Sequence, residues 1–254
     1  MKPALSGRKP RYPSNWESLP AGNDLKDIIE HALDDVSRQI FGYHFLKLGS
    51  LSSELSLSHS PIKHIFSMTE ELGLDNAAIV GKSQDLPFQE NSIDAVLLAH
   101  EMDFSQDPHQ VLREVNRVIT PNGHVIIVGF SPFSPAGLLR FFPINPKQIL
   151  HEARFFSSVR IKDWLHLLGF EVVNHQRLIF SELFFERRVH EDSRWQRWCQ
   201  KYLPVFSTVY VIVAKKRVMP LSLVRPKWKP KPNFTAVGAS MRIDSSSRMK
   251  KNLL

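Results

Sequence analysis

The chain has 254 residues, of which 43% are hydrophobic and 23% charged, and its net charge is +8. This length suits one α/β domain with a sizeable core and some decorations, and the composition is that of a globular protein. The single cysteine, Cys199, excludes an internal disulfide framework and a cysteine-rich zinc site. The longest uninterrupted apolar stretch, 209–214, is too short to span a bilayer, and we see no secretory signal pattern, so we expect a cytoplasmic protein.

The positive charge is concentrated at the C-terminal end. Residues 215–254 hold eleven basic residues and one acid, a net charge of +10, which leaves −2 for residues 1–214. We therefore expect a near-neutral folded body and a basic, disordered tail over 218–254 that contains the proline-rich stretch PKWKPKP. Such a tail suits phosphate backbones or anionic lipid, but it says nothing about a pocket.

The N-terminal part predicts an arm followed by a helix. Residues 1–23 are rich in proline, serine and basic residues, which is typical of an irregular arm, and Tyr12 and Trp16 are the aromatic residues able to pin it. Asp24 is a candidate N-cap for a helix with one apolar stripe. That stripe consists of Leu25, Ile28, Ile29, Ala32, Leu33, Val36 and Ile40.

Five short apolar runs predict strands, and helical patterns separate them. The runs are 43–48, 64–68, 77–80, 93–99 and 124–129. Before the last run, Asp107 and Pro108 offer an N-cap and a first-turn proline for a helix, which Pro121-Asn122-Gly123 is expected to end with a turn. Strand, helix and strand in this order indicate a parallel sheet with right-handed connections.

The C-terminal half continues the alternation with less regular segments. Residues 138–154 are predicted to form a mobile lid or an ordinary long loop. Ser157 or Ser158 caps a helix that ends at Gly169, and strands are expected over 170–174 and 209–214. Between these strands, 181–204 is rich in arginine and tryptophan, which suits either nucleic-acid binding or an amphipathic insertion that covers the sheet.

The stretch LPFQENSIDAVLLAH, followed by DPHQVLREVNRVITPNGHVIIVGF, carries a resemblance to a known family. It resembles the second half of the class I S-adenosylmethionine (SAM) methyltransferases of the type 11 group, and the arrangement with Trp16 near the N-terminus is similar to a small uncharacterised bacterial branch of it. The resemblance implies a Rossmann-like α/β fold with a seven-stranded, mostly parallel sheet, an antiparallel last strand and helices on both faces. It also implies a methyltransferase domain over 24–217, SAM as cofactor, and methyl transfer to an unidentified acceptor. No cluster of metal-ligating residues stands out in the sequence, so we expect no metal.

The resemblance also implies a set of site residues. Because parallel strands end at one edge of the sheet, we expect the positions after the first four strands to converge there. The implied cofactor-binding residues are Gly49, Ser50, Leu51, Glu70, Gln84, Asp85, Leu86, His100 and Met102, with Phe130 and Phe133 as a substrate wall. Within this set, Glu70 would accept the ribose hydroxyls. His100 is a candidate general base, and the alternative is that it packs or lines the pocket.

Three departures from the family pattern leave a second reading open. Only Gly49 remains of the glycine-rich loop, Lys47 stands where the family places an acid, and Lys82 stands where an acid often binds the adenine amino group. The alternative is therefore an inactive methyltransferase-like module that binds RNA or a protein through 181–204 and the basic tail. A third reading keeps the enzyme and makes nucleic acid its substrate.

Overall fold

A computed structural model describes residues 10–70, 78–134, 149–178 and 207–217, and the statements below concern these residues. The predictions for the arginine- and tryptophan-rich segment 181–204, for most of the lid and for the tail 218–254 lie outside them.

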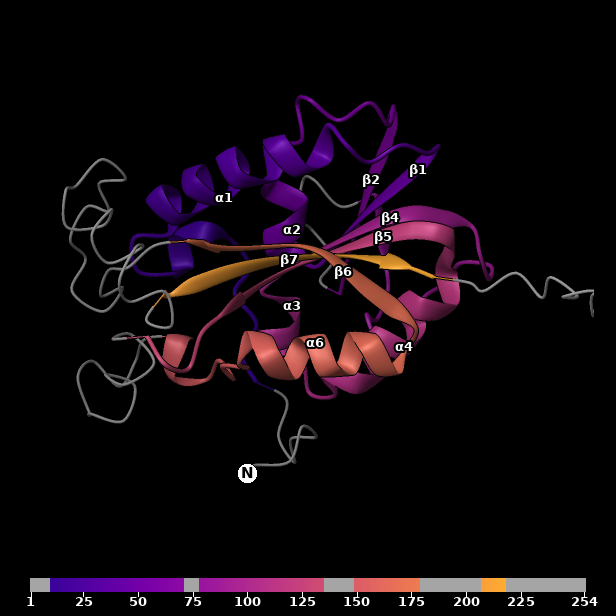
Figure 1. Cartoon of the computed structure of the whole chain (residues 1–254). Coiled ribbons are helices and arrows are strands. Elements are labelled where there is room, and N and C mark those ends of the chain that lie inside the picture. Colours follow the sequence, from indigo (N-terminus) through magenta and orange to yellow (C-terminus); the bar gives the residue numbers. More distant parts are fainter. Residues whose placement is uncertain (1–9, 71–77, 135–148, 179–206, 218–254) are drawn as a thin grey trace, which may run out of the picture. The chain divides into compact units, whose positions relative to one another are not determined.

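The centre of the fold is a seven-stranded sheet (Figure 1) in the order β3-β2-β1-β4-β5-β7-β6. Strands β1 to β5 pair in parallel, whereas β7 is antiparallel to both β5 and β6. This confirms the predicted mostly parallel sheet with an antiparallel last strand. The bounds are β1 His44–Leu48, β2 His64–Thr69, β3 Ile79–Val80, β4 Ile93–Ala99, β5 Ile119–Phe130, β6 Phe170–Leu178 and β7 Val209–Lys216.

Helices cover both faces of this sheet, with α1 and α2 on one face and α4 and α6 on the other (Figure 1). Side chains alternate along β4, so that Ala95 and Leu97 face the first layer while Val96 and Leu98 face the second. None of the helices within the described ranges is long and apolar enough to cross a membrane. The bounds are α1 Gly22–Ser37, α2 Ser50–Glu54, α3 Glu101–Phe104, α4 Pro108–Val118 and α6 Ser158–Leu167, with 3-10 turns η1 at Trp16–Ser18 and η2 at Ile149–His151.

Two of the predicted helix caps are confirmed and one is wrong. The Asp107 carboxylate accepts from the first backbone N–H groups of α4, and the Ser157 hydroxyl accepts from the Arg160 N–H in α6. In α1, however, Asp24 lies inside the first turn, because the helix begins at Gly22. A Cβ at Gly22 would lie 1.7 Å from the carbonyl oxygen of Trp16, so contact with η1, not a capping side chain, sets this helix start.

The predicted turn between α4 and the fifth strand is also wrong. Strand β5 begins at Ile119, directly after α4, and contains Pro121-Asn122-Gly123. The register against β4 shifts there, and Asn122 takes a left-handed conformation with φ +66°, so the three residues form an irregularity within the strand. Strand β6 also runs four residues beyond its prediction, to Leu178, because β7 pairs along its whole length.

Candidate functional site

A cavity of about 630 Å³ lies at the edge of the sheet where the first parallel strands end. Residues 48–50 span the end of β1, 68–70 span the end of β2, and 81–84 follow β3. The turn of α3 and the N-terminal arm close the other sides. Beyond the three strand ends, the lining consists of Glu101, Phe104, Ser105, Gln106, Ile149, Pro10, Arg11, Tyr12, Ser14 and Ser18.

The floor of the cavity is Gly49, which only glycine can occupy. Its φ is +93°, and a Cβ there would lie 2.2 Å from Glu101 Oε2 and 2.4 Å from Tyr12 Oη. Its backbone N–H donates to the Met68 carbonyl at 2.8 Å, which ties the floor to the end of β2. The one glycine retained from the family loop therefore stands where backbone and polar side chains approach most closely.

The larger residues that replace the other family glycines turn away from the cavity. Leu51 is fully buried in the core, and its carbonyl accepts from Trp16 Nε1 at 2.9 Å. The Ser52 hydroxyl accepts from the Ala99 N–H at 2.8 Å, and the Ser53 hydroxyl donates to a carbonyl within α2. Of the predicted binders in this loop, Gly49 and Ser50 line the cavity and Leu51 does not.

Lys47 has a structural partner at the end of α2. Its Nζ donates to the carbonyls of Ser53 and Leu55, at 2.8 and 3.0 Å. Burial lowers the pKa of Lys47 below its ordinary value of 10.5. The ammonium thus caps a helix end and takes no part in the cavity lining, whereas Lys82 lies in that lining and is exposed.

Two carboxylates from different strand ends line the cavity. Glu70 directly follows β2 and accepts from the Ser83 hydroxyl at 3.4 Å. Glu101 follows β4, is only 3% exposed, and accepts from the Tyr12 hydroxyl at 2.5 Å. Burial and the Glu101 charge raise the pKa of Tyr12 well above its ordinary value of 10, so the phenol remains a proton donor. Strand β1 separates β2 from β4, so the two carboxylates come from strand ends that lie about 10 Å apart.

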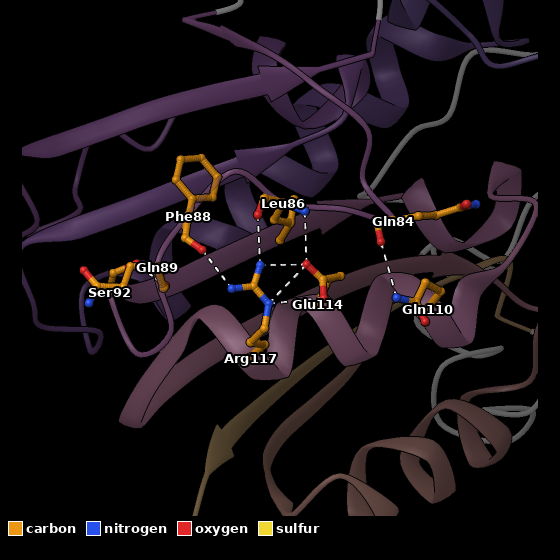
Figure 2. Close-up of polar contacts among 8 residues, drawn as sticks. All are labelled: Gln84, Leu86, Phe88, Gln89, Ser92, Gln110, Glu114 and Arg117. Atoms are coloured by element: carbon orange, nitrogen blue, oxygen red, sulfur yellow. Dashed lines mark hydrogen bonds and ion pairs between the residues drawn. The ribbon is translucent and has the colours of Figure 1, made fainter.

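Helix α4 holds the loop that continues from the cavity-lining residues 81–84, and Figure 2 shows the contacts between this helix and the loop. Arg117 donates to the carbonyls of Leu86 and Phe88, at 2.9 and 2.8 Å, and pairs with Glu114 at 2.7 Å. Glu114 also accepts from the Leu86 N–H at 3.1 Å, and hydrogen bonding to Arg117 lowers its pKa below 4.5. We call this group the α4 clamp. Because the clamp turns Leu86 into the core, Gln84 is the predicted adenine-end residue that reaches the cavity.

The remaining predicted site residues do not reach the cavity. Asp85 is exposed to solvent outside it, and Met102 is buried in the core on the α4 side. His100 is fully buried, its Nδ1 lies 2.9 Å from Asp103 Oδ2, and its ring stacks on Phe130 with ring centroids 3.9 Å apart. The placements of His100, Met102 and Phe130 follow from core packing.

Phe133 also lies outside the cavity lining, because its side chain is 57% exposed at the surface. Neither phenylalanine of the predicted substrate wall therefore lines the cavity.

Sequence reasoning missed Tyr12 and Arg11 on the arm, and it gave Glu101 no role. A signal for Glu101 was present, since it is an acid two residues after the buried strand 93–99. No local signal existed for the arm, because the bond from Tyr12 to Glu101 joins positions 89 apart.

Comparison with known proteins supports the fold and the family. A family profile described as "Methyltransferase domain" matches residues 52–127. The uncharacterized protein YafS of Escherichia coli K12 is 33% identical over 242 residues, covering 94% of this chain and 97% of YafS. A SAM-dependent methyltransferase from Archaeoglobus fulgidus superposes with TM-score 0.56 at 15% identity, over 75% of this chain and 94% of that one. The [4+2]-cyclase SpnF superposes with TM-score 0.53 at 15% identity, over 85% and 89%, a likeness of fold alone.

The cavity fits the family's cofactor. Its volume lies in the range of roughly 300–1,000 Å³ that is usual for small-molecule sites, and Leu51 does not fill it. SAM carries a ribose diol and an α-ammonium, which both donate hydrogen bonds that carboxylates accept, and Glu70 and Glu101 both line the cavity. Within the described ranges, no group of three or more His, Cys, Asp or Glu residues is arranged to hold a metal. The chain belongs to the class I SAM-dependent methyltransferases of the type 11 group.

Proposed function

We propose that this protein transfers the methyl group of SAM to an acceptor that binds beside the cavity. The observation that carries the proposal is the open cavity over Gly49, which persists although most family glycines are replaced. The side chains that replace the glycines pack into the core, and Lys47 binds carbonyls at the end of α2, so these departures from the family pattern do not argue for a decayed pocket. We further propose that the reaction takes place in the cytoplasm.

The residues of the cavity act by binding and by excluding water. SAM supplies a sulfonium-activated methyl group, so no covalent nucleophile from the protein is required. Glu70 accepts the ribose hydroxyls, and Gln84 lies at the adenine end. Tyr12 and Phe104, whose rings meet edge to face at 5.8 Å, close the side opposite the strand ends. This alignment in a dry site is the protein's contribution to the rate.

We assign His100 a packing role in place of general-base catalysis. Its side chain is fully buried between Phe130 and Trp16, and it is absent from the cavity lining. Proton removal from the acceptor then falls to solvent or to the acceptor's own chemistry.

Calorimetric titration with SAM and S-adenosylhomocysteine tests the proposal. We expect both to bind, and Glu70→Gln to weaken both by about 10-fold or more, because a charged acceptor of two hydroxyl groups is lost. Asp85→Asn is the matched control, since Asp85 directly follows the cavity-lining residues 81–84 but lies outside the cavity. This variant should bind both ligands like the wild type. If neither ligand binds at millimolar concentration, the proposal that this protein is a SAM-dependent methyltransferase is wrong.

The charge of the chain favours a polyanionic partner for the tail. The net charge of +10 over 215–254 supports the proposal that this segment contacts nucleic acid. Deleting 218–254 should lower RNA affinity and flatten its dependence on salt, while SAM affinity stays unchanged. An unchanged salt slope after the deletion would show that the tail does not hold nucleic acid.

A further inference from the structure

The ammonium of SAM needs an anionic partner that the expected position does not supply. Lys47 stands where the family places an acid, and its own ammonium is bound to the carbonyls of Ser53 and Leu55. A cation at that place would repel the cofactor's α-ammonium if it faced the cavity. The end of the cavity at β1 therefore requires a carboxylate from another element.

Glu101 is the carboxylate at that end. Its Oε2 lies directly over the floor, since a Cβ on Gly49 would meet it at 2.2 Å. It comes from the end of β4, two strands from the end of β2 that Glu70 follows, and both acids line the cavity. If Glu70 held the ribose, the amino-acid part of the cofactor would extend toward the ends of β1 and β4, where Glu101 lies.

We propose that Glu101 binds the α-ammonium of SAM, in place of the acid that Lys47 replaces, and that Tyr12 positions the Glu101 carboxylate. This assignment rests on the proposed function. A carboxylate has about four acceptor sites, so the hydrogen bond from Tyr12 is compatible with a second donor.

The N-terminal arm is anchored so that Tyr12 performs this role. The backbone N–H of Arg11 donates to Glu152 at 2.6 Å, and the Trp16 indole donates to the Leu51 carbonyl at 2.9 Å. These two contacts flank Tyr12, whose ring packs against Phe104. The arm is thus a structural part of the site that orients the acid of β4.

The test compares two ligands that differ in the amino-acid part. S-adenosylhomocysteine carries the ammonium, whereas 5′-methylthioadenosine keeps the adenosine and the sulfur and lacks it. We expect Glu101→Gln to weaken S-adenosylhomocysteine by about 10- to 100-fold, the usual effect of losing a buried charge-assisted hydrogen bond. Methylthioadenosine should bind within about twofold of the wild type, because its contacts avoid Glu101.

Two further variants complete the experiment. Tyr12→Phe should weaken S-adenosylhomocysteine but not methylthioadenosine, and by less than Glu101→Gln does. The Glu101 carboxylate is still present in this variant, but it has lost the hydroxyl that positions it. Glu152→Gln is the matched control, because it removes an acid that holds the arm yet does not line the cavity, and it should not change the ratio of the two affinities. Thermal unfolding of each variant shows that it folds, and Tyr12→Phe carries the test if Glu101→Gln does not.

The outcomes separate this assignment from the proposed function. Equal binding of S-adenosylhomocysteine by Glu101→Gln and wild type overturns the assignment, as does an equal loss of both ligands. Binding of neither ligand by the wild type overturns the proposed function and the assignment together.

Discussion

Replacing Arg117 with alanine tests whether the α4 clamp positions the cavity wall. The guanidinium bonds two backbone carbonyls, Leu86 O and Phe88 O, and pairs with Glu114. Bonds to a charged donor are worth about 1.5–3 kcal/mol each when buried. The Arg117 side chain is 30% exposed, so in the variant water can hydrogen-bond to the two carbonyls in its place. We therefore take about 1 kcal/mol of lost stability for each carbonyl. The expected loss in free energy of unfolding is therefore about 2 kcal/mol.

The same change should weaken the cofactor. Residues 81–84 line the cavity directly before the clamped segment, and loss of the clamp leaves this loop to be ordered on binding. Ordering one residue costs about 1–2 kcal/mol, which corresponds to roughly a 10-fold loss in affinity for S-adenosylhomocysteine. Because Tm alone would not reveal this loss of affinity, both the free energy of unfolding and the affinity for S-adenosylhomocysteine have to be measured.

Arg113→Ala is the matched control for this experiment. Arg113 lies one turn earlier on α4, is exposed, and bonds only the Gln110 side chain, at 3.2 Å, among the described contacts. Urea unfolding and calorimetric titration are compared for the two variants. If Arg117→Ala matches Arg113→Ala within about 0.5 kcal/mol and binds S-adenosylhomocysteine like the wild type, the clamp has no positioning role.

Three further changes probe the cap, the ion pair and the floor. Asp107→Ala should reduce the free energy of unfolding by about 1 kcal/mol and Asp107→Asn by much less, because the amide oxygen still caps α4; equal losses in urea unfolding would contradict this. Arg117 lowers the pKa of Glu114, so the stabilisation from this ion pair is present above pH 4.5 and is lost as the pH falls through the lowered pKa. The difference in free energy of unfolding between wild type and Glu114→Gln should shrink over that range, and a constant difference would refute the pairing. Gly49→Ala should abolish measurable S-adenosylhomocysteine binding, because the new Cβ collides with Glu101 at a positive φ, and calorimetry showing wild-type affinity would contradict the position of the floor.

The central elements were predictable because their signals are local. The apolar run 93–99, the Asp107 cap and the helical spacing on α4 each lie within about ten residues, and together they indicate a parallel unit. The location of the cavity followed from topology, since parallel strands end at one edge. The shift in β5 was missed because it depends on pairing with β4, where Asp94 accepts from the Thr120 hydroxyl.

By itself, the sequence determined the order and type of the strands, the face pattern of α4, and the position of the single glycine at the floor. Tertiary structure alone decided where the side chains around that glycine point: Leu51 toward Trp16, Lys47 toward the end of α2, and Tyr12 onto Glu101. The physical reason is distance along the chain. Periodicity and capping arise between near neighbours, whereas these contacts, apart from that of Lys47, join segments 35 to 89 residues apart that meet only when the sheet is formed.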